Sequence, residues 1–67
     1  MTAAQRIYPK PVKTIYGPAL LYGYDPDKRL ANVGYKPDEC NSDELKAHYF
    51  RGGTYMICMI EQEAVLE

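Results

Sequence analysis

The sequence has few of the residues from which catalytic and metal sites are built. It contains no Trp, one His and two Cys among its 67 residues. The soft metal ligands Cys40, His48 and Cys58 are widely separated, whereas zinc sites usually draw their ligands from close pairs. The sequence also has no glycine-rich phosphate loop and no nucleophile elbow. We therefore expect no metal, no cofactor and no enzymatic activity.

The sequence also lacks any long apolar segment. No run approaches the ~20 apolar residues that a membrane helix requires, and neither an apolar signal-peptide core nor a lipidation motif occurs. The scarcity of Cys is typical of a protein from a reducing compartment with free thiols. These features predict a soluble, cytoplasmic protein with no membrane partner.

The length of the chain predicts one small domain spanning residues 1–67. A domain of this size buries only about 60% of the surface that its unfolded chain exposes. The composition, with 46% hydrophobic and 25% charged residues, is typical of a chain that folds. Residues 1–5 are small and polar, so we expect them to be frayed.

The strongest signal in the chain is the segment Thr54–Gln62, which reads TYMICMIEQ and follows two glycines. A short apolar run bounded by glycines and charged residues is typical of a buried strand. Alternation along a strand sends two sets of side chains to opposite faces, namely Tyr55, Ile57 and Met59 on one and Met56, Cys58 and Ile60 on the other. Both faces are apolar. We therefore expect one face to meet the helix and the other to meet a partner or a curled sheet.

Three further strands are predicted upstream of this segment. Val12–Tyr16 and Ala19–Tyr24 flank a Gly-Pro turn, which predicts a hairpin. Leu30–Tyr35 lies between two turns that share the frame Gly-Tyr-x-Pro-Asp. In the second strand, alternation predicts that one side carries Leu20, Tyr22 and Tyr24.

A single helix is predicted over Asn41–Arg51. Asn41 or Ser42 provides an N-cap, and Leu45 and Tyr49 form an apolar stripe four residues apart. The predicted order is therefore β-β-β-α-β. We expect an α+β domain in which one helix packs on one face of an antiparallel sheet of three to four strands.

The apolar strand and the seven tyrosines favour a protein-protein interaction module. Such a module binds and modulates a partner protein, as a regulatory protein does, or assembles as a homodimer. The competing interpretation is that the hairpin folds over and closes a small barrel. The predicted partner-binding residues are Tyr22, Tyr24, Arg29, Tyr35, Tyr55 and Met59.

The alternative function is binding of single-stranded nucleic acid. Residues 1–36 hold six basic and two acidic side chains, and the basic residues alternate with tyrosines, as in many single-strand binders. Residues 37–67 hold two basic and seven acidic side chains, and the overall pI is near 5.7. An acidic protein is a poor match for a phosphate backbone, so we expect a protein partner rather than nucleic acid.

Overall fold

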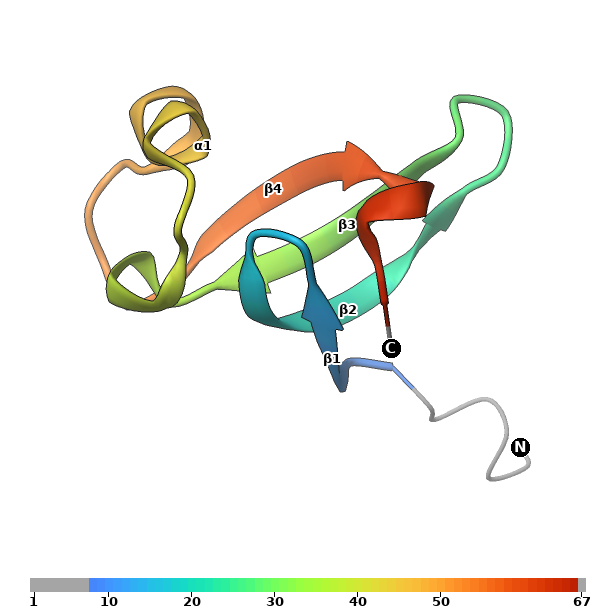
Figure 1. Ribbon diagram of the computed structural model, residues 1–67, viewed down its shortest axis with the longest axis horizontal. Helices are drawn as coiled ribbons and strands as arrows, with labels where there is room; N and C mark the ends of the chain where they lie inside the picture. Colours follow the sequence, from blue (N-terminus) through green and yellow to red (C-terminus); the bar gives the residue numbers. More distant parts are fainter. Residues whose placement is uncertain (1–7, 67) are drawn as a thin grey trace.

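The computed structural model describes residues 8–66, and the predicted fraying of residues 1–5 lies outside them. Four strands form one antiparallel sheet in the order β1-β2-β3-β4, with the helix α1 between the last two strands (Figure 1). The strands are β1 (Lys10–Thr14), β2 (Gly17–Asp25), β3 (Leu30–Tyr35) and β4 (Met56–Glu61). This architecture confirms the predicted α+β fold and the order β-β-β-α-β.

The helix α1 (Asp43–Tyr49) is shorter than the predicted Asn41–Arg51. Ser42 is its N-cap, because its hydroxyl accepts a hydrogen bond from the backbone N–H of Leu45 at 3.2 Å. The backbone N–H of Asn41 instead donates to the carbonyl of Tyr16 at 2.9 Å. This bond ties the segment before the helix to the turn between β1 and β2. None of the helices within residues 8–66 has the length and apolar composition needed to cross a membrane.

The two 3-10 helices extend the strands that precede them. η2 (Pro37–Glu39) follows β3, and η3 (Gln62–Ala64) follows β4. In Figure 1, η3 lies across the strands, whereas α1 stands at one end of the sheet. Ala64 of η3 is buried and belongs to the core, while Leu45 and Tyr49 of α1 pack against its margin.

The segment after η3 returns to the first strand and closes the sheet. Val65 forms an antiparallel bridge with Thr14. The N–H of Ile15 donates to the carbonyl of Ala64 at 3.0 Å, and the N–H of Leu66 donates to the carbonyl of Lys13 at 2.7 Å. The sheet is therefore curled. The segment after η3 closes it against β1, and the hairpin β1-β2 does not fold over to do so.

The core lies on the enclosed face of this curled sheet. Its largest fully buried side chains are Tyr35, Leu21, Met56, Ile60, Val33 and Cys58. The predicted alternation of β4 is confirmed, because Met56, Cys58 and Ile60 are buried while Tyr55 and Ile57 are exposed. One face of β4 is thus covered by other parts of the chain, and the other face is exposed to solvent.

A hydrogen bond joins the turn after β1 to the end of β4. The hydroxyl of Tyr16 donates to Glu61 Oε1 at 2.6 Å. This bond lowers the pKa of Glu61 and, together with partial burial, raises the pKa of Tyr16. The bond therefore connects the start of η3 to the turn between β1 and β2.

We predict that Tyr16→Phe makes the free energy of unfolding less dependent on pH between pH 7 and pH 3. Because the pKa of Glu61 is lower in the folded state, its contribution is present above the usual pKa of 4.5 and is lost as pH falls through the folded pKa. The exposed bond contributes on the order of 0.5–1 kcal/mol. Urea unfolding at pH 7 and pH 3 measures the difference, which should be present at pH 7 and shrink at pH 3. The control Tyr55→Phe should show no such change, and an equal loss at both pH values would contradict the assignment.

Candidate interaction surface

A bulge in β2 separates two tyrosines that were predicted to share one side. Leu21 is opposite Val33, but Gly23 is opposite Asn32, so Tyr22 is an extra residue without a partner in β3. After the bulge, Tyr24 is opposite Ala31 and thus lies on the enclosed side of the sheet. The shared side predicted for Tyr22 and Tyr24 is therefore wrong. Alternation from Leu20 alone carries no information about an inserted residue.

Tyr22 lies on the open face of the sheet, over a glycine. A Cβ added to Gly34 would be 2.9 Å from Tyr22 Cε2 and 3.3 Å from Ile57 Cδ1. The tyrosine ring and the isoleucine therefore meet above a position that only a glycine can occupy without displacing them. Gly34 itself is opposite Leu20 on one side and Ile57 on the other.

This arrangement creates an exposed apolar region that we call the outer patch. Tyr22 and Tyr55 are each 41% exposed, and Ile57 is 54% exposed. Leu20 and Met59 are half-buried beside them. The outer patch is defined as Leu20, Tyr22, Gly34, Tyr55, Ile57 and Met59.

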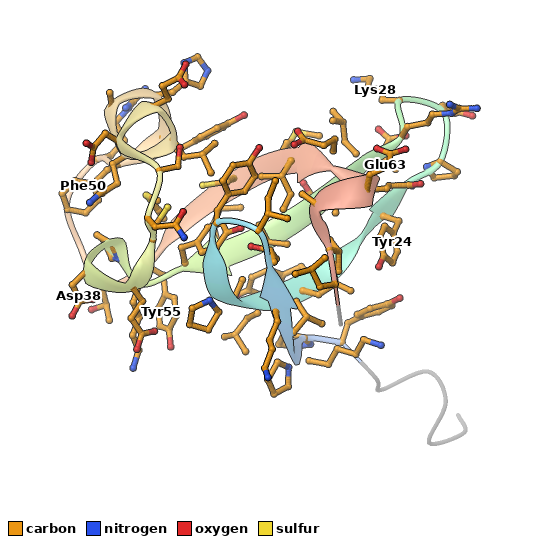
Figure 2. The ribbon with its side chains drawn as sticks, in the orientation of Figure 1. Tyr24, Lys28, Asp38, Phe50, Tyr55 and Glu63 are labelled. Atoms are coloured by element: carbon orange, nitrogen blue, oxygen red, sulfur yellow. The ribbon has the colours of Figure 1, made fainter. Side chains whose placement is uncertain are left out.

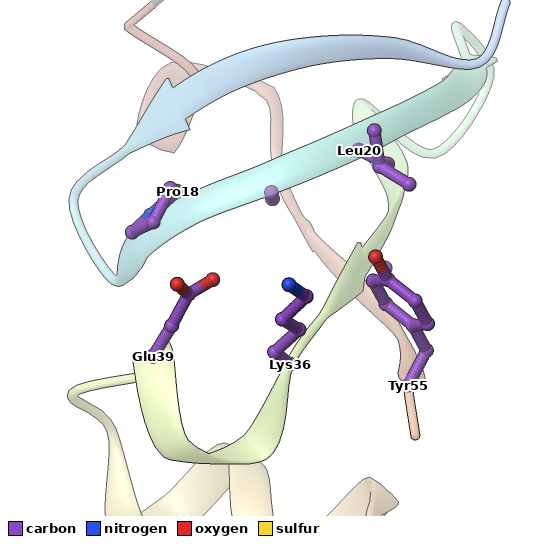
Figure 3. Close-up of a pocket in the computed structure, with 7 residues that line it drawn as sticks. Pro18, Leu20, Lys36, Glu39 and Tyr55 are labelled. Atoms are coloured by element: carbon purple, nitrogen blue, oxygen red, sulfur yellow. The ribbon is translucent and has the colours of Figure 1, made fainter.

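One end of the outer patch deepens into a pocket of about 200 Å³. Its walls come from β2, the end of β3, η2 and the residue before β4, and Figure 3 shows the lining residues as sticks. The lining comprises Pro18, Ala19, Leu20, Gly34, Lys36, Glu39 and Tyr55. The pocket therefore combines an apolar wall with one cation, one anion and a phenol hydroxyl.

Lys36 and Glu39 are the two charged groups of this pocket. In Figure 3 both side chains extend from the segment 36–39 toward β2. Both residues are exposed, and the only ion pair within residues 8–66 joins Lys46 to Asp43 instead. Their charges are thus presented to solvent at the edge of the outer patch.

Gly17 fixes the position of Glu39. Its φ is +122°, and a Cβ there would be only 2.4 Å from the carbonyl oxygen of Glu39. The first residue of β2 therefore has to be glycine for η2 to approach so closely. Glu39, which lines the pocket, is therefore held close to the start of β2.

The six predicted partner-binding residues lie in different parts of the structure. Tyr22, Tyr55 and Met59 lie in the outer patch. Tyr24 lies on the other face, and Figure 2 shows Tyr24 and Tyr55 at opposite ends of the molecule. Arg29 belongs to the turn between β2 and β3. Three of the six predicted residues therefore share one surface.

Tyr35 was predicted to contact a partner, but it lies in the core. It is 0% exposed, and its hydroxyl is 2.5 Å from the hydroxyl oxygen of Thr14, to which it is hydrogen-bonded. Burial raises the pKa of Tyr35 to about 12. The physical reason is strand alternation, because Tyr35 shares the enclosed face with Val33 while Gly34 between them faces outward.

Sequence reasoning missed several contributors to this surface. Leu20 and Glu39 were absent from the predicted set, whereas Ile57 was placed with Tyr55 and Met59 on one face of the apolar strand, either face of which was a candidate for a partner. The alternation of β4 was a sufficient signal for Ile57. Glu39 reaches the pocket only through the turn of η2 and the contact with Gly17, and no local pattern indicates that contact.

Cys40, His48 and Cys58 are the soft ligands and candidate nucleophiles of the chain. Cys40 and Cys58 are free and buried, and burial raises the pKa of Cys58 to about 11. A buried protonated thiol is a poor nucleophile. His48 lies on α1 with its ring edge against Tyr49 at a centroid distance of 4.7 Å. Residues 8–66 contain no cluster of three or more side chains suited to hold a metal ion.

Comparison of the chain with models of known protein families gave no match. Comparisons with curated proteins and with solved structures gave no significant match either. The outer patch and its pocket are therefore the features from which a function can be inferred.

Arg29 has a structural role in the β2-β3 turn. Its φ is +57°, in the left-handed region that disfavours side chains larger than glycine. In this conformation its carbonyl accepts a hydrogen bond from the N–H of Gln62 at 3.1 Å. The turn itself is held by Asp25 Oδ1, which accepts from the backbone N–H groups of Asp27 and Lys28. Arg29 thus connects the hairpin to the start of η3.

We predict that Arg29→Gly stabilises the fold by up to about 1 kcal/mol. Glycine adopts the left-handed conformation without the steric cost and keeps the backbone carbonyl that bonds Gln62. The matched variant Arg29→Ala removes the same side chain but retains the strain, so it should not gain stability. Urea unfolding measures both. If Arg29→Gly were less stable than Arg29→Ala, the arginine side chain itself would be needed for the turn.

Proposed function

We propose that the protein is a small, non-enzymatic interaction module that binds a partner protein through the outer patch and modulates that partner. The observation that carries the proposal is the exposure of Tyr22, Tyr55 and Ile57 together on one sheet face. Contiguous apolar surface on a folded domain usually marks an interaction site. Tyrosine is enriched at such sites because its ring is apolar while its hydroxyl tolerates water.

The outer patch has the anatomy of a binding surface. Its centre is apolar, with the ring of Tyr22 packed over Gly34 beside Ile57. Its margin is polar, with Lys36 and Glu39 at the pocket. Interfaces commonly combine a desolvated apolar centre with a polar rim. A complementary partner would place an apolar side chain in the pocket and one charge of each sign at its margin.

The chemistry of the remaining polar groups supports a binding role rather than catalysis. Burial keeps the thiol of Cys58 protonated, and the charged groups of the pocket are exposed. General acid-base or nucleophilic catalysis relies on groups whose reactivity is increased by their neighbours. We also place the protein in the reducing cytoplasm, which is supported by its two free, buried thiols.

Binding of single-stranded nucleic acid receives less support from the arrangement of charge. Figure 2 shows Lys28 at the opposite end of the molecule from Tyr55, and Glu39 accompanies Lys36 at the pocket. A nucleic-acid groove needs cations in register with its aromatic platforms. Salt separates the two functions, because phosphate contacts weaken steeply with added salt and an apolar interface does not.

We predict that Ile57→Lys abolishes partner binding and leaves the fold intact. The matched control is Ile15→Lys, because Ile15 is 52% exposed, close to the 54% of Ile57, but belongs to the β1-β2 turn. Placing a charge at the centre of an apolar interface should weaken the complex by roughly 30-fold or more, as at a binding hot spot. Both variants should unfold within about 0.5 kcal/mol of the natural chain.

The measurement is affinity capture from native lysate after nuclease treatment, followed by titration of the retained protein. A protein retained in stoichiometric amount by the natural chain and by Ile15→Lys, but lost with Ile57→Lys, supports the proposal. Equal retention by both variants would move the interface away from the outer patch. Retention that disappears with nuclease, and falls steeply with salt, would instead favour nucleic acid.

A further inference from the structure

We infer that the outer patch is a two-fold interface and that its occupant is a second copy of this chain. The inference rests on the proposed function, since it names the partner of the same surface. In an interface with two-fold symmetry, the same patch on both copies has to complement itself in charge and in shape. The outer patch and its pocket meet both requirements.

The charge of the surface complements itself. The pocket contains one cation, Lys36, and one anion, Glu39, and every other lining side chain is neutral. A strongly acidic or strongly basic partner would therefore meet a repulsive group next to each attractive one. A second copy turned by two-fold rotation can place its Glu39 against Lys36 and its Lys36 against Glu39. One pair of residues thus supplies two intermolecular contacts.

The shape of the surface also complements itself. The pocket provides a hollow of about 200 Å³ at one end of the outer patch. Ile57, the most exposed apolar side chain of the patch, projects from the same face. Gly34 lines the pocket and also lies beside Ile57, so the hollow and the projection are adjacent. Each copy can therefore both offer and receive an apolar side chain.

Pairing through the face of the sheet is favoured over pairing through its edge. The sheet has two edge strands, of which β1 is bridged by Val65 at Thr14, and β4 is the other; an unprotected edge can pair with a strand of another copy. Here the carbonyl of Met59 accepts a hydrogen bond from the hydroxyl of Tyr49 at 3.3 Å, so α1 covers the middle of that edge. The outer patch has no such cover within residues 8–66.

The size of the chain determines how large a share of its surface a dimer would bury. A standard interface buries about 800 Å² of each partner. That is roughly one sixth of the 4668 Å² surface of this chain. Small domains often gain stability by association, because their own cores are limited in size.

The test reverses one of the two charges in each of two variants. Sedimentation over a range of protein concentrations measures their association. The natural chain should show a monomer-dimer equilibrium. Lys36→Glu leaves two acidic side chains at the pocket, and Glu39→Lys leaves two basic ones. Either variant alone should dimerise at least about 10-fold more weakly, because both intermolecular contacts become repulsive. An equimolar mixture of the two variants should recover a dimer, since opposite charges then face each other again.

The controls separate this inference from the proposed function. Ile57→Lys should abolish the dimer and Ile15→Lys should retain it, while thermal unfolding confirms that all variants fold. A natural chain that stays monomeric up to millimolar concentration overturns the inference, as does a mixture no tighter than its components. If the chain is monomeric but a captured protein is still lost with Ile57→Lys, only the inference fails. If no Ile57-dependent partner is found either, the proposed function fails with it.

Discussion

The return of the C-terminal segment to β1 is the interaction on which the rest of the structure depends. A four-stranded sheet with one short helix would leave much of its apolar side uncovered. The bridge between Val65 and Thr14, together with the bonds to Lys13 and Ile15, brings Ala64 over that side. The enclosed core is thus completed by a few residues of 3-10 helix rather than by α1. Arg29 and Tyr16 each add a hydrogen bond that holds the start of η3 in place.

Completion of the core decides which surface remains for binding. Within residues 8–66, α1 packs against the margin of the core and Ala64 of the C-terminal segment belongs to it. The other side therefore keeps the apolar side chains that β4 presents by alternation, joined by Tyr22 from β2. The two expectations for the apolar strand, a closed sheet and a surface for a partner, are thus compatible. The enclosed face of the sheet agrees with the expectation of a closed sheet. The opposite face supports the proposal of a surface for a partner.

The sequence was sufficient for the elements but not for the assembly of the surface. The run Tyr55–Ile60, the turn residues and the helix cap predicted the four strands, the helix and their order, because these signals are local. Tyr24 and Tyr35 were misplaced because their positions depend on a bulge and on which face is enclosed. Glu39 was missed because a contact with Gly17, over twenty residues away, brings it to the pocket. Such nonlocal contacts leave no periodic signal.

The extra residue in β2 divides that strand into two segments with opposite phase. Before Tyr22, even-numbered positions such as Leu20 face outward, whereas after it Tyr24 faces inward. Deletion of Tyr22 itself would remove only the extra residue, because Leu21, Gly23 and Tyr24 would remain opposite their present partners in β3. Substitutions in relatives of this chain should therefore follow two independent alternation patterns along β2. Loss of Tyr22 would therefore remove an exposed aromatic ring from the outer patch without reversing the two faces of β2.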